Sequence, residues 1–90
     1  MLYEFRWNNW NEEHIAEHGI DPRSAEWVVN HPFRGFPREH GDDKFIAWGQ
    51  IESGHYLQVI YTFDPPGVVY VIHARPLTDK ENRRVRRGRR

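Results

Sequence analysis

The sequence predicts an α+β domain in which an antiparallel sheet is flanked by helices. Ninety residues suffice for one domain with one modest core. In the first third of the chain, capping residues precede stretches with helical spacing. From residue 44 onward, three β-rich stretches are separated by clusters of turn residues. The expected order of elements is therefore β-α-α-β-β-β-α, within a single domain over residues 1–90.

The chain is expected to open with a strand and a helix. Residues 2–7 alternate aromatic side chains with others, which is typical of a strand. Asn8 or Asn9 can cap a following helix over residues 10–18, and Gly19 suits the end of that helix.

A second helix and a loop follow. Asp21 and Pro22 form the pair of an N-cap and a first-turn proline, which predicts a helix over residues 22–30. Pro32 ends this helix. Residues 33–43 are rich in glycine, proline and charged side chains and are expected to form a loop.

The second half of the chain predicts an antiparallel meander and a last helix. The expected strands are residues 44–51, 56–63 and 68–75, and the last two are apolar on both faces, which places them centrally in the sheet. Thr78 and Glu81 have the spacing of a capping box, so a helix should begin there and run into the arginines. The basic tail is expected to fray from about residue 86.

Charge is divided unevenly along the chain, although the formal net charge is zero. Residues 1–74 carry five basic and eleven acidic side chains, whereas residues 75–90 carry eight basic and two acidic ones. A basic end on an acidic body can attract phosphates or an acidic partner. The alternative is a solvated tail that keeps the protein in solution.

Composition excludes several classes of protein. The absence of cysteine excludes a disulfide scaffold and thiolate zinc sites, and fits the cytoplasm. The N-terminus has no apolar segment typical of a signal peptide. The apolar runs are far shorter than the roughly 20 residues that span a bilayer, so no membrane association is expected.

One short motif matches a metallopeptidase signature. His14, Glu17 and His18 fit the H-x-x-E-H pattern, in which two histidines one helical turn apart bind zinc. Helical projection, however, places both histidines on the stripe of Trp7 and Trp10 that is expected to face the core. We therefore interpret them as structural and expect no metal site and no cofactor.

The end of the last strand carries the strongest candidate for phosphate binding. Alternation places Val71, His73 and Arg75 on one face of this strand, with Ile72 and Ala74 on the other. An arginine just before a helix can hold two phosphoryl oxygens while the helix N-terminus adds a favourable dipole. The alternative is a structural ion pair from Arg75 to an acid such as Glu81, and a purely structural His73.

RNA cleavage without a metal requires a base for the 2′-hydroxyl, an acid for the leaving 5′-oxygen, and cations for the developing charge. Side chains that can supply these functions are Lys44, His55, His73, Arg75 and Glu81. Phosphates can also bind, without sequence preference, to the arginine run formed by Arg83, Arg84, Arg86 and Arg87 and the two that follow.

Several fragments, in order, resemble the BrnT family of bacterial toxins, part of the RelE/ParE-like group. They are Phe5-Arg6-Trp7, His18-Gly19, Asp43-Lys44-Phe45-Ile46-Ala47-Trp48-Gly49, Leu57-Gln58-Val59-Ile60-Tyr61-Thr62, Ile72-His73-Ala74-Arg75 and Glu81-Asn82-Arg83-Arg84. The resemblance covers nearly the whole chain. It implies a RelE/ParE-like fold, endoribonuclease activity that inhibits translation, and a cognate antitoxin protein encoded alongside.

The resemblance also assigns roles to residues. The arginine of the family's Ile-Ser-Ala-Arg segment corresponds to Arg75, its basic residue at the start of a strand to Lys44, and its acidic residue in the last helix to Glu81. The chain departs from the family at three positions, with His55 for an arginine, His73 for the serine and Val85 for a tyrosine.

Two hypotheses of different classes follow. The first is a cytoplasmic, metal-independent endoribonuclease toxin with RNA as substrate, a cognate antitoxin as partner and a homodimer as one possible assembly. In it, Arg75 and Lys44 stabilise the phosphate, His55 or His73 transfers protons, and Glu81 orients Arg75. The second is a non-catalytic nucleic-acid- or protein-binding module in which the arginines bind and the histidines are structural.

Overall fold

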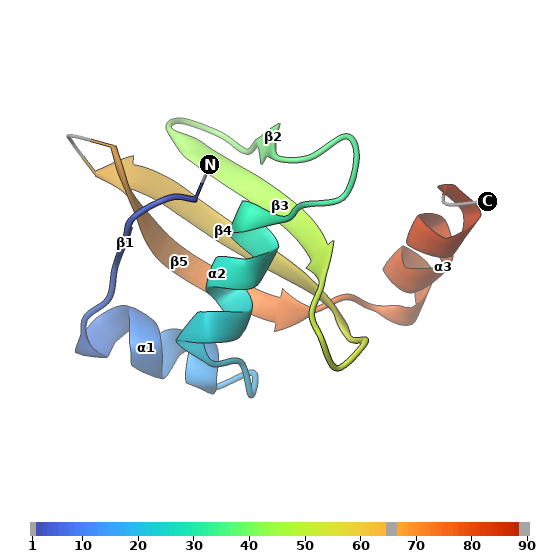
Figure 1. Cartoon of the computed structure of the whole chain (residues 1–90), viewed down its shortest axis with the longest axis horizontal. Coiled ribbons are helices and arrows are strands. Elements are labelled where there is room, and N and C mark those ends of the chain that lie inside the picture. Colours follow the sequence, from blue (N-terminus) through green and yellow to red (C-terminus); the bar gives the residue numbers. More distant parts are fainter. Residues whose placement is uncertain (1, 65–66, 89–90) are drawn as a thin grey trace.

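The chain folds around a five-stranded mixed sheet with the strand order β1-β5-β4-β3-β2 (Figure 1). The computed structural model describes residues 2–64 and 67–88. Its elements are β1 (Phe5–Arg6), α1 (Asn9–Ala16), α2 (Pro22–Asn30), β2 (Arg38–Glu39), β3 (Lys44–Gln50), β4 (Tyr56–Asp64), β5 (Val68–Pro76) and α3 (Asp79–Gly88). The expected α+β class and the order of the main elements are confirmed.

Strand directions confirm the meander but correct the expectation of a fully antiparallel sheet. β3, β4 and β5 pair antiparallel in sequence order, and β4 and β5 each have a strand on both sides. β1, however, runs parallel to β5 and pairs through Phe5 with Val69 and through Arg6 with Tyr70. The many residues between β1 and β5 allow the crossover that a parallel pair requires.

A short extra strand lies within the segment expected to be a loop. β2 pairs antiparallel with β3, with Arg38 opposite Ile46 and Glu39 opposite Phe45. Two residues are too few for side-chain alternation to give a signal in the sequence.

The polar caps predicted for all three helices are present. The Asn8 side chain accepts a hydrogen bond from the backbone N–H of Asn11, and the Asp21 side chain accepts one from that of Ser24. Thr78 and Glu81 form the reciprocal capping box at the start of α3. One helix end differs from expectation, because α1 ends at Ala16, whereas α3 runs into the arginines as expected and extends through Gly88.

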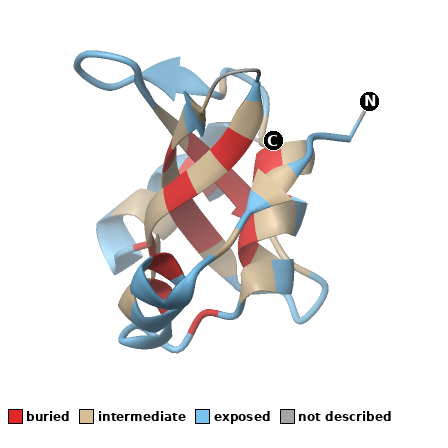
Figure 2. Ribbon diagram, turned by 90° about the vertical axis from the view of Figure 1, so that its left-hand side faces the viewer, coloured by how far each residue is buried: buried red, intermediate tan, exposed pale blue. Residues whose placement is uncertain are grey.

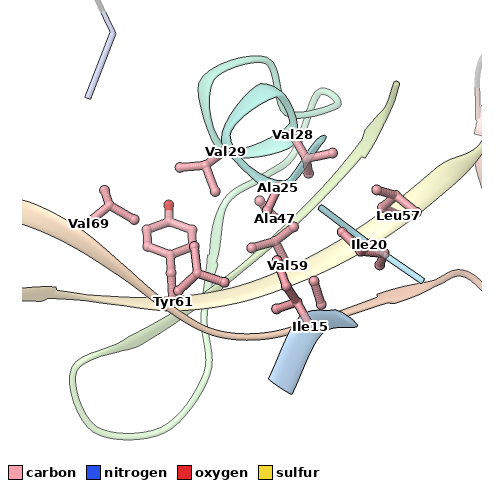
Figure 3. Close-up of a cluster of buried hydrophobic side chains, with 12 residues drawn as sticks. Ile15, Ile20, Ala25, Val28, Val29, Ala47, Leu57, Val59, Tyr61 and Val69 are labelled. Carbon is pink, nitrogen blue, oxygen red and sulfur yellow. The ribbon is translucent and has the colours of Figure 1, made fainter. Parts of the chain in front are cut away.

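Helices α1 and α2 cover one face of the sheet, which we call the core face (Figure 3). Ile15 from α1, Val28 from α2, and Val59 from β4 are fully buried there. Gly49 of β3 lets α2 approach closely, since a Cβ atom at this position would lie 3.2 Å from the backbone oxygen of His31 and from Val28 Cγ1. Figure 2 shows buried residues along the sheet and on the helix sides that face it.

A bulge corrects the expected alternation in β5. Val71 pairs with Tyr61, but His73 pairs with Ile60, so Ile72 is the extra residue between them. Val71 and Ala74 therefore share the core face, where both are fully buried. His73 and Arg75 lie on the opposite face, which we call the outer face.

The core side of α1 also differs from expectation. Trp10 is 54% exposed, His18 is exposed and His14 is half-buried, so the histidine stripe does not face the core. The buried residues of α1 are Asn11 and Ile15. The Asn11 amide donates hydrogen bonds to the backbone oxygens of β1 and β5, which ties α1 to both strands. Among the described residues, no helix has the length and apolar character needed to cross a membrane.

Candidate nucleic-acid site on the outer face

Three neighbouring strands place Trp48, Gln58 and Arg75 in one row across the outer face. Trp48 pairs with Gln58, and Gln58 pairs with Arg75. The side-chain oxygen of Gln58 accepts hydrogen bonds from the Trp48 indole at 3.0 Å and from Arg75 Nη2 at 3.2 Å. Gln58 is only 8% exposed, so this one acceptor fixes the orientation of both neighbours.

Arg75 forms a bidentate ion pair with Glu81. Arg75 Nη1 lies 2.8 Å from Glu81 Oε1, and Nη2 lies 3.0 Å from Oε2. Nη1 also donates to the backbone oxygen of Pro76. All four hydrogens of the two terminal nitrogens are therefore engaged. Of the two alternatives left open by the sequence, the ion pair to Glu81 is the one present.

The ion pair makes Glu81 strongly acidic. The hydrogen bond from Arg75 lowers the pKa of Glu81 from 4.5 to about 2, and the backbone N–H of Thr78 contributes in the same direction. Glu81 therefore closes the capping box and clamps Arg75 at the same time. This contact fixes the start of α3 to the end of β5.

Helix α3 stands at one end of the sheet, away from α1 and α2 (Figure 1). Its Val85 packs with Leu77 and Trp48 into a second, smaller apolar cluster, which Phe33 and Phe36 partly cover. Between α3 and residues 32–38 lies an open hollow of about 700 Å³. Its lining combines aromatic rings with three arginines, Arg34, Arg38 and Arg84.

Four of these side chains form what we call the arginine–aromatic column. The rings of Phe36 and Trp48 stack with centroids 5.0 Å apart. The Arg38 guanidinium lies 4.5 Å from the Phe36 centroid, and that of Arg84 lies 5.6 Å from the Trp48 centroid. Within residues 2–64 and 67–88, neither arginine has a carboxylate at ion-pair distance, so both retain N–H donors for an anion.

A second group, the histidine trio, lies beside Arg75 on the free edge of β5. β1 pairs only with Val69 and Tyr70 in the described structure, and α1 lies along the remainder of β5. His73 of β5 meets His18 at 5.0 Å and His14 at 5.9 Å between ring centroids. Burial lowers the pKa of His73; His18, His14 and Arg75 lower it further, and Glu17 opposes them.

The other two predicted catalytic residues line hollows of their own, and the hollow of His55 includes Pro76, the residue after Arg75. Lys44 starts β3, four residues from Trp48 or roughly 13 Å along the strand, in a hollow with Glu39, Asp42 and Asp43. His55 lies in the turn before β4, contacts Ser53 Oγ, and lines a hollow of about 300 Å³ that includes Arg86. The fold therefore brings Arg75 and Glu81 into contact, adds His73 on the same face, and does not join Lys44 to them.

All four arginines predicted to bind RNA are exposed on α3, but the structure distinguishes them. Arg84 joins the column and Arg86 lines the hollow of His55, while Arg83 and Arg87 face solvent. Arg89 and Arg90 lie outside the described residues.

Sequence reasoning missed the column and two members of the trio. Phe36 and Arg38 fall in a segment without periodicity, and their partner Trp48 looks like an ordinary core residue of a strand. Helical projection places His14 and His18 on a stripe with Trp7 and Trp10 that is expected to face the core. The exposure of Trp10 and the early end of α1 place them beside His73 instead.

Among the described residues, no group of three or more histidine, aspartate or glutamate side chains is arranged to hold a metal ion. Comparisons with protein-family models, with curated protein sequences and with solved structures gave no match. The class defined by the fold is an α+β domain with a mixed sheet.

Proposed function

We propose that this protein is a metal-independent endoribonuclease of the toxin type, which binds single-stranded RNA on its outer face. The arginine–aromatic column is the observation that carries the proposal. Guanidinium groups bind phosphates with two hydrogen bonds, and the stacked rings of Phe36 and Trp48 hold the two guanidiniums of the column in place. The column presents Arg38 and Arg84 within one open hollow.

Charge supports the same ligand. Eight of the thirteen basic side chains fall in the last sixteen residues, and α3 carries Arg84 to the hollow and three further arginines on its exposed surface. The acidic remainder of the chain repels a polyanion, which restricts favourable electrostatic contact to this end. The resemblance to BrnT toxins supplies the reaction class, and with it a cytoplasmic site of action and a cognate antitoxin partner.

Within this proposal Arg75 is a positioning residue. Its terminal nitrogens are engaged by Glu81, Gln58 and Pro76, so its role is to hold the start of α3 and orient Trp48 through Gln58. Arg84 then reaches the Trp48 ring from the next turns of α3. Arg84, rather than Arg75, contacts the RNA phosphate.

The second candidate is a non-catalytic RNA-binding module of the same fold. The full engagement of Arg75 favours it, because the cation expected to stabilise a reacting phosphate is already neutralised by Glu81. Both candidates share the column, and they differ in whether RNA is cut.

Two measurements test the proposal. Binding of a fluorescent single-stranded RNA is titrated at several salt concentrations for wild type, Arg84→Gln and the control Arg23→Gln. Arg23 is an exposed helix arginine outside the hollow, so it matches the loss of charge. The logarithm of the affinity falls linearly with the logarithm of the salt concentration. Removing one phosphate contact makes this dependence less steep by about 0.7, and we expect this only for Arg84→Gln.

Cleavage is tested by mapping cellular RNA 5′ ends by primer extension after a brief pulse of expression. New internal ends with wild type support the ribonuclease. Specific RNA binding without new ends identifies the binding module instead. Equal salt slopes for Arg84→Gln and Arg23→Gln contradict the column as the RNA site.

A further inference from the structure

We propose that His73 and His18 are the general base and general acid that cleave the RNA held by the outer face. This inference rests on the proposed function and adds the groups that perform the chemistry. It starts from the juxtaposition of three imidazoles that are separate in sequence: His14 on α1, His18 in the turn after it, and His73 on β5.

The location of the trio connects it to the RNA-binding part of the face. His73 and Arg75 are alternate residues on the outer side of β5, and Arg75 is the end of the row that leads through Gln58 to Trp48. An RNA strand whose phosphates bind Arg38 and Arg84 and which runs across the sheet therefore meets the trio. The residues it crosses include Ile46 and Ile60, which pair with each other and are half-buried.

Proximity divides the roles of the imidazoles. His73 contacts both other imidazoles, and a positive charge on His73 is disfavoured beside them. His73 is half-buried and borders Arg75, and these surroundings keep it neutral, as a base must be. His18 is its nearer partner and is exposed, so a leaving oxygen can reach it.

His14 positions the pair without taking part in proton transfer. Its ring stacks on Trp10 with centroids 4.7 Å apart and an interplanar angle of 10°. The same ring meets the edge of His73. Loss of this ring frees His73 to rotate but removes neither the base nor the acid.

The proposed step is balanced in atoms and charge and needs no other reactant. Neutral His73 removes the proton from the 2′-hydroxyl, and the 2′-oxygen forms a bond to the adjacent phosphorus. The bond from phosphorus to the 5′-oxygen breaks, and protonated His18 gives its proton to that oxygen. The products are a 2′,3′-cyclic phosphate and a 5′-hydroxyl end, and the two histidines have exchanged protonation states.

The test measures cleavage and binding of one short single-stranded RNA by the purified full chain. We expect His73→Gln and His18→Gln each to lower the cleavage rate about 100-fold or more at unchanged RNA affinity, the usual scale for a proton-transfer group. His14→Gln should lower it less. His40→Gln is the matched control, since His40 is exposed and lies outside the trio.

Two further readouts separate catalysis from a structural role. In wild type the cleavage rate should fall at low pH as His73 gains a proton, and His73→Gln should lose this fall. An RNA with a single 2′-deoxy residue at the cut site should bind and not be cleaved.

The outcomes distinguish the two proposals. If wild type cleaves and both variants retain rates within threefold of it, the assignment of His73 and His18 is wrong and the proposed ribonuclease function is retained. If purified wild type binds the RNA and leaves it intact under all conditions, both the proposed ribonuclease function and the assignment of the two histidines are wrong.

Discussion

The two faces of the sheet are built from the same strands and have opposite character. The core face is closed by α1 and α2 over aliphatic side chains that are almost fully buried. The outer face carries a row of polar and aromatic groups, and α3 covers it only at one end. The core face supplies the stability of the domain, and this stability allows the outer face to leave Arg84 exposed and His73 and Arg75 half-buried.

The bulge in β5 creates this difference between the two faces at His73 and Arg75. Without the extra residue, His73 would share a face with Val71 and point into the core. The bulge lets Val71 and Ala74 both pack inward while His73 and Arg75 stay on the outer face. Bulges are frequent beside functional sites for this reason.

The largest expected effect on stability comes from a substitution on the core face. Ile15→Ala removes a fully buried side chain at the contact of α1 with the sheet and should lower the free energy of unfolding by about 2–5 kcal/mol. Chemical denaturation measures this. Ile60→Ala, at a half-buried position on the outer face, is the comparison and should cost less than half as much. Equal costs would contradict the asymmetry of the two faces.

An intermediate effect is expected where α3 joins the outer face. Arg75→Ala removes the ion pair with Glu81 and the hydrogen bond to Gln58, whose exposed fractions are 20% and 8%. It should lower the free energy of unfolding by about 1.5–3 kcal/mol. Limited trypsin digestion should also cut α3 faster. Arg23→Ala serves as the control. Unchanged stability together with lost RNA binding would show that Arg75 contacts the ligand directly.

A smaller effect should appear on acidification. The folded-state pKa of Glu81, about 2, lies below its ordinary value of 4.5, so its stabilisation is complete above pH 4.5. It is lost as the pH falls from 4.5 toward 2. Allowing for solvent screening, the loss should be about 1–2 kcal/mol.

The stability difference between wild type and Glu81→Gln, measured by denaturation at each pH, isolates this contribution from the other carboxylates. That difference should shrink over the interval from 4.5 to 2. Glu52→Gln, in an exposed turn, should show a constant difference. A constant difference for Glu81→Gln would mean that the ion pair does not stabilise α3.

Local signals in the sequence correctly located the caps and the meander. Asn8, Asp21 and Thr78 are caps because a short polar side chain satisfies backbone N–H groups a few residues ahead. The strands of the meander follow from β-branched composition between turn residues. The pair of Arg75 and Glu81, which are six positions apart, is one of the two alternatives that the sequence predicts.

Interactions between distant segments were not accessible in this way. The parallel pairing of β1 with β5, the two-residue strand β2 and the bulge at Ile72 depend on register across the sheet. The same holds for the column, which joins residues 36–38, β3 and α3, and for the trio, which joins α1 to β5.

The sequence by itself determined the class of fold, the helix starts, the central strands and the concentration of positive charge at the C-terminal end. These depend on propensity, capping and composition within a few residues of the chain. The tertiary structure alone decided which side chains meet: Arg75 turned inward to Glu81 and Gln58, Arg84 laid over Trp48, and three histidines gathered at one strand edge. Such contacts are set by strand register and helix docking, which no local pattern encodes.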